Sequence, residues 1–180
     1  MPFPTVRRVV TGQKSNGSSV LTHVEDVAGI TNANGLQWYG VWGWQEMPNL
    51  PYSTTEPFQT MSVFPASGGV RVNTIVFPPR YGHADATPVA QASDGTYEKL
   101  EAGSGSLRHD SQPGMHTTDS VDLGFVSAGE LVSIQGDGTE VTLRPGDVNV
   151  QNGAMHAWRN DSNEPCMITF VVMGTSREAV

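Results

Sequence analysis

Short β-branched runs separated by glycine-containing turns fill residues 115–160 and restrict this part of the chain to antiparallel β-structure. The runs at 121–126, 131–134 and 140–143 have strand length, and the first alternates in a period of two, which is typical of a strand with unlike faces. Gly136-Asp137-Gly138 supplies the positive φ angles that a tight hairpin needs. The spacing therefore predicts a succession of short hairpins.

Two histidines and one acid fall on these predicted hairpins. His116, Thr118 and Asp122 share one parity, so they lie on one face if the strand is regular from residue 116. His156 and Trp158 share a parity on the last strand of the stretch. If Trp158 has the inward parity, it either presents a flat apolar surface to a ligand or packs into the core.

The end of the stretch resembles the second sequence motif of the cupin family. Gly153, His156 and Asn160 have the spacing of that motif, and Gly146 precedes them. Gln151 stands where the family usually has proline.

The stretch from His116 to Gly129 resembles the first cupin motif. Asp122 replaces the glutamate of that motif at the same spacing from Gly129, and Thr118 occupies the position of its second histidine. The sequence is similar to that of small single-domain cupins of bacteria and fungi, which also tend to open with a segment like residues 6–12. The resemblance implies an all-β fold, a cupin-type antiparallel double-sheet jelly-roll barrel with an N-terminal strand extension and long loops. Cupins bring the strand of the second motif beside the first motif, so the resemblance also implies that His116, Asp122 and His156 converge in one cavity.

Length and turn signals indicate one domain of six to eight strands. A chain of 180 residues is long enough for one sizeable core and short for two. We expect residues 1–69 to supply N-terminal strands and a covering loop, and residues 70–180 to form the barrel core with a loop insertion at 80–112. An N-terminal strand from Val6 would have an unpaired edge, and cupins often pair such a strand with a neighbouring subunit. The expected assembly is a homodimer, with residues 1–69 as its contact region.

Charge and composition limit the kinds of binding partner that this chain is expected to have. A formal net charge of −8 argues against nucleic acid and anionic membranes, which need concentrated Lys and Arg. No apolar run approaches the roughly 18 residues of a membrane span. The single cysteine, Cys166, excludes an intrachain disulfide, and a reducing cytoplasm is the simplest location.

Several polar and aromatic residues outside the stretch 115–160 can be interpreted in two ways. Trp42 and Trp44 would share a strand face, either as a core or dimer-contact cluster or as an aromatic wall over a ligand. Arg71 and Asn73 share a face of an apolar strand, where they either meet water or form the polar floor of a cavity; for Arg71 we expect water. His109 is close enough in sequence to the first motif to reach the mouth of the cavity.

The chemistry of the chain is expected to rest on His116, Asp122 and His156. Two imidazoles and a carboxylate can hold a divalent ion such as Fe, Mn, Zn or Ni, and without metal they can act as general acid and base. No glycine-rich phosphate loop is present, so no nucleotide cofactor is expected. The residues expected to contact the substrate are Trp158, Thr118, Trp42, Trp44 and His109.

The cupin resemblance implies a function on small molecules. We expect an enzyme of the lyase or isomerase type that acts on a small, mostly apolar organic acid or enolisable carbonyl compound, by decarboxylation, dehydration or isomerisation. An Fe(II)-dependent dioxygenase and a non-catalytic small-molecule-binding cupin are the alternatives, because the cupin fold hosts many unrelated reactions.

Overall fold

Antiparallel strands dominate the part of the chain that the computed structural model describes, which is residues 5–56, 58–59, 61–84, 96–101, 106–108 and 114–178. The side chains of Glu98 and of residues 106–108 are outside this description. The helix α1 covers Thr96–Glu101, and no described helix is long and apolar enough to cross a membrane. The strands are β1 (Arg7–Gln13), β2 (Ser19–Asp26), β3 (Ile30–Thr31), β4 (Gln37–Trp44), β5 (Val70–Phe77), β6 (Ser106–Arg108), β7 (His116–Thr118), β8 (Ser120–Ala128), β9 (Leu131–Gln135), β10 (Glu140–Leu143), β11 (Val148–Gln151), β12 (His156–Arg159) and β13 (Cys166–Gly174).

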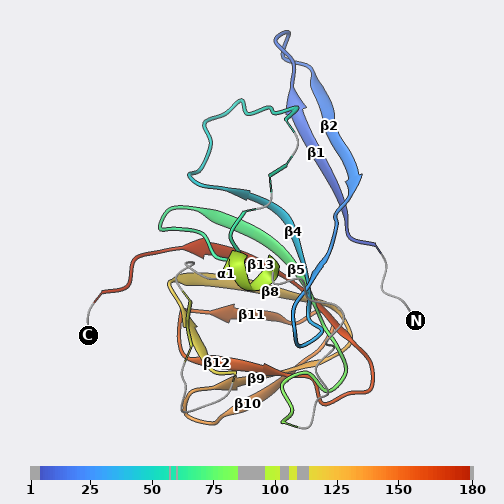
Figure 1. Cartoon of the computed structure of the whole chain (residues 1–180). Coiled ribbons are helices and arrows are strands. Elements are labelled where there is room, and N and C mark those ends of the chain that lie inside the picture. The colour runs from blue at the N-terminus through green and yellow to red at the C-terminus, as the bar shows by residue number, and fades with distance from the viewer. Residues whose placement is uncertain are drawn as a thin grey trace.

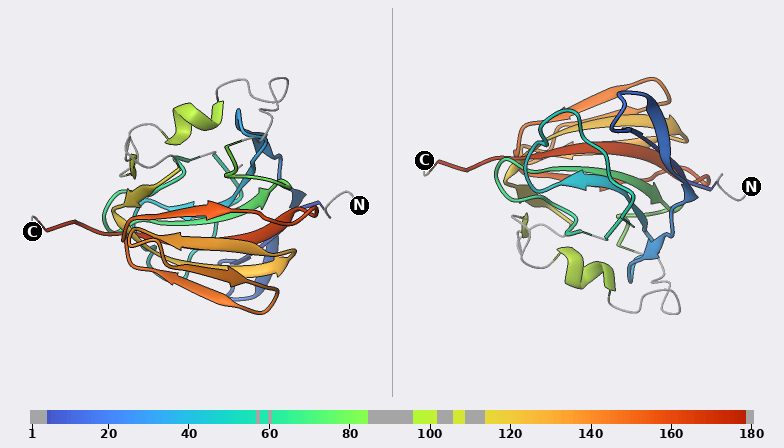
Figure 2. Two further views of the ribbon diagram at one scale, coloured as in Figure 1. Left: turned by 90° about the horizontal axis from the view of Figure 1, so that it is seen from below. Right: turned by 90° about the horizontal axis from the view of Figure 1, so that it is seen from above.

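The strands form one hairpin and two larger sheets. One sheet has the order β10-β9-β12-β7-β6 and the other the order β11-β8-β13-β5-β4-β3. The two sheets share one hydrophobic core, to which Leu131 contributes from the first and Phe77 and Ile168 from the second. The hairpin of β1 and β2 extends away from both (Figure 1), and Figure 2 shows the same arrangement from below and above. The predicted all-β double sheet with an N-terminal strand extension is confirmed.

The described residues form more strands than the six to eight that the turn signals predict. The two larger sheets have five and six strands, with the short strands β3 and β6 each at one edge, and β1 and β2 form a separate hairpin. Both β3 and β4 precede residue 69 and belong to the same sheet as β5, so the predicted boundary there runs through a sheet. Within residues 80–112, which we expect to be a loop insertion, the structure describes α1 and β6. The assignment of residues 1–69 to a dimer contact stays a prediction.

The chain crosses from one sheet to the other between β7 and β8. The sequence pattern predicts one regular strand from residue 116, but β7 lies in the five-stranded sheet and β8 in the six-stranded sheet. Every second side chain remains buried across this crossing, as Thr118, Ser120 and Asp122 show. His116 and Asp122 therefore approach the interior from different sheets.

A β-bulge in β4 separates its tryptophans. The register of β4 against β5 shifts between Gly40 and Trp42. An extra residue in a strand reverses the face of the side chains that follow it. Trp38 is consequently buried in the core, whereas Trp42 and Trp44 line a second hollow next to β1.

Arg71 is buried, contrary to the expectation that it meets water. It is 2% exposed, and its guanidinium donates to the carbonyl oxygens of Ser62, Trp44 and Val70 and to the side chains of Gln45 and Ser62. These acceptors come mainly from the segment after β4, far from Arg71 in sequence. The buried guanidinium thus holds the covering loop against the sheet.

The turn between β8 and β9 gives a test of the fold. Gly129 has a φ of 68°, and a Cβ there would collide with the carbonyl oxygen of Pro165. Gly138, in the next turn, has a φ of 85° and open space around it. We expect Gly138→Ala to lower the free energy of unfolding by about 1–2 kcal/mol, the usual cost of a left-handed conformation, and Gly129→Ala to lower it further. Urea unfolding measures both, and equal losses would contradict the close approach at Gly129.

Candidate functional site

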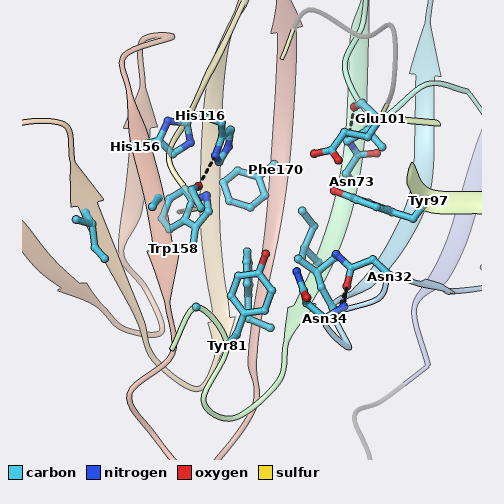
Figure 3. A pocket seen from close by; sticks show the side chains of 18 of the residues that line it. Asn32, Asn34, Asn73, Tyr81, Tyr97, Glu101, His116, His156, Trp158 and Phe170 are labelled. Carbon is cyan, nitrogen blue, oxygen red and sulfur yellow. Dashed lines mark hydrogen bonds between the residues drawn. The ribbon is translucent and has the colours of Figure 1, made fainter. Parts of the chain in front are cut away.

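A cavity of about 420 Å³ lies among residues of both larger sheets and of α1, and Figure 3 shows it from close by. This volume lies in the range typical of small-molecule sites. Its walls are mostly apolar and aromatic, with Phe64, Phe77, Tyr81, Tyr97, Trp158 and Phe170 among them. The histidine, aspartate and glutamate side chains that line it, among the residues described, are His83, Glu101, His116, Asp122 and His156.

The two motif histidines lie side by side in this cavity. His116 on β7 and His156 on β12 are directly opposite each other in an antiparallel pair, and their ring centroids are 4.3 Å apart. The Nδ1 atom of His116 is 3.1 Å from the carbonyl oxygen of Gly114, and the Nδ1 atom of His156 is 2.8 Å from that of Ala154. Each imidazole is therefore oriented by the backbone two residues before it.

These contacts decide which nitrogen of each ring carries a proton. A carbonyl oxygen can only accept a hydrogen bond, so Nδ1 of each histidine must donate. A neutral imidazole with a proton on Nδ1 has its lone pair on Nε2. His116 and His156 thus have the same tautomer when neutral, and the lone pair of His156 on Nε2 can serve as a base or a metal ligand.

Burial shifts the pKa values of two groups in opposite directions. It lowers the pKa of His156 to about 4, with a further contribution from the charge of His116, while the Ala154 carbonyl acts against the shift. It raises the pKa of Asp122 to about 6, and the nearby Ser120 hydroxyl offsets part of that rise. The Oδ1 atom of Asp122 has no hydrogen-bond partner among the described residues. Near neutral pH, His156 is an uncharged base and Asp122 retains some of its acid form.

Trp158 links the histidines to an aromatic wall. Its ring centroid is 5.4 Å from that of His156 and 5.7 Å from that of Phe170. Phe77 packs on the other side of Trp158, with ring centroids 6.2 Å apart. Trp158 lines the cavity and also packs against the core, so both positions that the sequence allowed for it are observed.

The predicted three-ligand metal set is not assembled. The described residues contain no group of three or more His, Cys, Asp or Glu side chains that could hold a metal ion. His116 and His156 face each other across paired strands, but Asp122 approaches from the other sheet because the chain crosses between β7 and β8. The two histidines alone have the donor chemistry of a metal site.

The other residues that we expect to contact the substrate either do not line the cavity or lie outside the described part of the chain. Thr118 is 1% exposed, is not among the residues that line the cavity, and its hydroxyl has no partner among the described residues. Trp42 and Trp44 are in contact with each other near the hairpin, where the Arg8 guanidinium lies 5.6 Å from the Trp42 ring centroid. The bulge in β4 thus corrects the prediction that they form a wall of the ligand cavity. His109 lies outside the described residues.

Several cavity residues have no clear signal in the sequence. Tyr97 and Glu101 lie on α1, inside a segment whose composition indicates a loop, and Tyr81 follows the Pro-Pro pair that ends β5. Asn73 also lines the cavity, so of its two readings the polar cavity floor is the one observed. The signal for Asn73 is a single amide side chain in a strand of β-branched residues.

Curated relatives match only part of the chain. The chain is 44% identical over 60 residues to the cupin-domain-containing oxidoreductase srdB of Neurospora crassa, which covers 33% of this chain and 31% of that protein. It is 45% identical over 49 residues to the phomopsin biosynthesis cluster protein C′ of Diaporthe leptostromiformis, covering 27% of this chain and 26% of that one. The matches thus span less than a third of these relatives.

Solved structures resemble the chain more loosely. A putative ethanolamine utilization protein of Salmonella typhimurium aligns over 97% of this chain and 100% of its own, with a TM-score of 0.44 and 9% identity. A cupin 2 conserved barrel domain protein of Salinispora arenicola aligns over 78% of this chain and 76% of its own, with a TM-score of 0.40 and 13% identity.

The family model described as a cupin domain matches residues 101–172, which include both motif histidines, Asp122 and the strands that carry them. This match agrees with the motif spacing in the sequence and with the antiparallel double sheet. The chain therefore contains a cupin-type domain.

Proposed function

We propose that this cupin is an enzyme that moves a proton at the carbon next to a carbonyl group of a small, mostly apolar compound. Isomerisation, dehydration and decarboxylation of enolisable carbonyl compounds all depend on such a step. The observation that carries the proposal is the pair His116 and His156, whose Nδ1 atoms are tied to backbone carbonyls inside a cavity with aromatic walls.

The histidine pair has the properties of a general base. With its Nδ1 donating to a carbonyl, His156 has Nε2 as the atom that can accept a proton from the substrate. The ring of His116 lies beside it, with the two centroids 4.3 Å apart. Repulsion between two charged rings disfavours a second proton on the pair, which keeps one ring neutral.

Asp122 is suited to act as the acid. Its pKa of about 6 leaves part of the carboxyl protonated near neutral pH, and a protonated carboxyl can donate to the carbonyl oxygen as the enol forms. A base and an acid whose environments separate their pKa values are a common arrangement in acid–base enzymes. The aromatic wall excludes water and binds the apolar part of the substrate.

A divalent metal would be held by His116 and His156, and it would polarise the carbonyl oxygen. The described residues do not complete a three-ligand set with Asp122, so the proposed steps use the side chains alone. Elemental analysis of protein purified without chelators, compared with His156→Ala, measures whether the pair retains Fe, Mn, Zn or Ni.

An oxidoreductase is the second candidate, because the Neurospora crassa relative is named as one. Oxygen consumption with the same carbonyl compounds distinguishes the two, since proton transfer alone consumes no oxygen. Tight binding with neither exchange nor oxygen uptake would indicate a binding protein.

Removal of the base should stop carbon-bound proton exchange. We expect the protein to catalyse exchange of the hydrogens next to the carbonyl of 4-phenylbutan-2-one with D₂O, and His156→Gln to slow it at least about a hundredfold, the lower end for loss of general-base catalysis. Proton NMR of the ketone measures the rate.

Asp119→Asn is the matched control for this measurement. Asp119 lies near the same strands but pairs with Arg177 and does not line the cavity, so its loss should leave exchange unchanged. Exchange by His156→Gln at the wild-type rate, or no exchange by the wild type, would contradict the proposed base.

The buried carboxyl of Asp122 should make stability depend on pH. Its pKa is raised from 3.8 to about 6, so ionisation favours the unfolded chain; the penalty is absent below pH 3.8 and complete above pH 6. We expect Asp122→Asn to raise the free energy of unfolding by about 3 kcal/mol at pH 7.5 in the presence of EDTA, from 1.36 kcal/mol per unit. The gain should shrink towards pH 4.

Urea unfolding of both proteins between pH 4.5 and 7.5 measures this difference. His156 contributes with the opposite sign, because its lowered pKa makes its stabilisation fall from pH 6.5 towards pH 4, but it does so equally in both proteins. A gain from Asp122→Asn that is constant across this range would show that the Asp122 carboxyl does not titrate near pH 6.

We also propose that the hairpin of β1 and β2 contacts a second copy of this chain. It is a two-stranded sheet that extends away from the others (Figure 1), and its side chains Val9, Leu21 and Val24 are exposed. A partner that covers these apolar side chains would remove them from water and stabilise the hairpin further.

A charge in this hairpin should weaken the dimer. We expect Leu21→Glu to shift the protein towards monomer in sizing chromatography, because the carboxylate would be buried in the interface. Val141→Glu, at an exposed apolar position on β10, is the control and should leave the elution unchanged. A Leu21→Glu protein that elutes like the wild type would count against this contact.

A further inference from the structure

Asn73 has a buried acceptor atom that no described residue satisfies. It lies on β5, is 2% exposed and lines the cavity. Its Nδ2 atom donates to the carbonyl oxygen of Val63 at 2.9 Å, whereas its Oδ1 atom has no hydrogen-bond partner among the described residues. Because the Val63 carbonyl can only accept, the amide nitrogen must face it, and the amide oxygen is the atom left over.

An unsatisfied buried acceptor destabilises a fold unless something donates to it. In a cavity wall, that donor is a water molecule or a ligand. The Nδ2 atom of Asn73 is therefore fixed to the protein, and its buried Oδ1 atom, in a residue that lines the cavity, is left without a donor among the described residues.

The surroundings of Asn73 hold it in place. The backbone carbonyl of Val63 accepts a hydrogen bond from Asn73. The backbone amide of Val63 donates to the carbonyl of Leu100 at 3.2 Å, and Leu100 is next to Glu101 at the end of α1. The preceding residue, Ser62, accepts from the buried Arg71. The wall that carries Val63 is thus tied both to β5 and to α1, and a rigid wall presents the Asn73 oxygen at a defined position.

An aromatic stretch separates this acceptor from the histidines. Phe170 on β13 lies directly opposite Asn73 in the strand register. From Phe170 the wall continues through Trp158 to His156, with centroid distances of 5.7 Å and 5.4 Å. Figure 3 shows Asn73 and Glu101 on one side of Phe170 and the two histidines on the other.

We propose that Asn73 binds the substrate at the end away from the histidines, by accepting a hydrogen bond from a hydroxyl group. The substrate is then a neutral compound with a carbonyl at one end, an apolar middle that lies on Phe170 and Trp158, and a hydroxyl at the other end. The position of the carbonyl rests on the proposed function, whereas the hydroxyl rests on Asn73 alone.

Three ketones that differ in one group test this assignment. The probes are 4-(4-hydroxyphenyl)butan-2-one, its methyl ether and 4-phenylbutan-2-one, titrated into the whole protein by calorimetry. We expect the phenol to bind about tenfold tighter than either analogue, because only the phenol donates to the Asn73 oxygen. Equal affinities, or no binding of the phenol, would overturn the proposal without use of any variant.

Two substitutions separate ligand binding from wall structure. Asn73→Asp keeps an acceptor and loses the donor to Val63, whereas Asn73→Leu loses both. If Asn73 binds the hydroxyl, Asn73→Asp retains the preference for the phenol and Asn73→Leu abolishes it. If Asn73 only supports the wall, both variants lose the preference equally, and the proposal fails.

His156→Gln distinguishes this proposal from the proposed function. It should lose proton exchange but keep the preference for the phenol, since the Asn73 oxygen lies on the other side of Phe170. If the wild-type protein prefers the phenol but never exchanges protons, only the proposed enzymatic function is contradicted. If it exchanges protons on all three ketones and binds them with equal affinity, only the proposed role of Asn73 is contradicted.

Discussion

The site depends on two hydrogen bonds of the same kind, in which an imidazole Nδ1 donates to the carbonyl two residues before it. Gly114 supplies this carbonyl to His116 and Ala154 supplies it to His156. Direct pairing of the two strands then places the rings 4.3 Å apart. Without these bonds each imidazole could turn over, and the nitrogen that carries the lone pair would not be determined. The backbone thereby gives both histidines the same orientation and the same Nδ1–H tautomer when neutral.

The rest of the cavity follows from where the two sheets meet. The five-stranded sheet supplies both histidines, and the six-stranded sheet supplies Asp122, Phe170 and Asn73. Polar groups therefore project from opposite sides into a space whose walls are aromatic. Burial in such a space lowers the pKa of His156 and raises that of Asp122, which favours the uncharged form of each. This combination suits proton transfer to and from a small apolar compound.

Sequence reasoning could predict the antiparallel double sheet and the residues at its centre. The motif spacing and the strand parity identified His116, Asp122 and His156, and all three line one cavity. Their assembly as metal ligands could not be judged in this way, because parity is the same whether or not the chain changes sheets at residue 119. The roles of these residues in catalysis stay predictions.

Other features were invisible in the sequence because they depend on distant segments. The bulge in β4 moves Trp42 and Trp44 off the cavity, and a one-residue irregularity leaves no trace in a pattern of aromatics. Arg71 is buried because Gln45 and Ser62, in the segment after β4, accept hydrogen bonds from its guanidinium, and such an acceptor cannot be predicted from strand periodicity. For the same reason the sequence could not decide whether Asn73 meets water or forms the polar floor of a cavity, since its hydrogen-bond partner Val63 lies in the same segment.

The central claim is that the tautomer of the histidine pair is set by the backbone, with Nδ1 protonated and Nε2 of His156 bare. Long-range ¹H–¹⁵N correlation spectra of the imidazoles, recorded with EDTA between pH 5 and 7.5, measure this directly. The structure predicts a neutral Nδ1–H form for His156 throughout this range, because its pKa is about 4, and a protonated Nδ1 for His116. A neutral Nε2–H form of either ring, or a His156 that becomes charged near pH 6.5, would contradict the account.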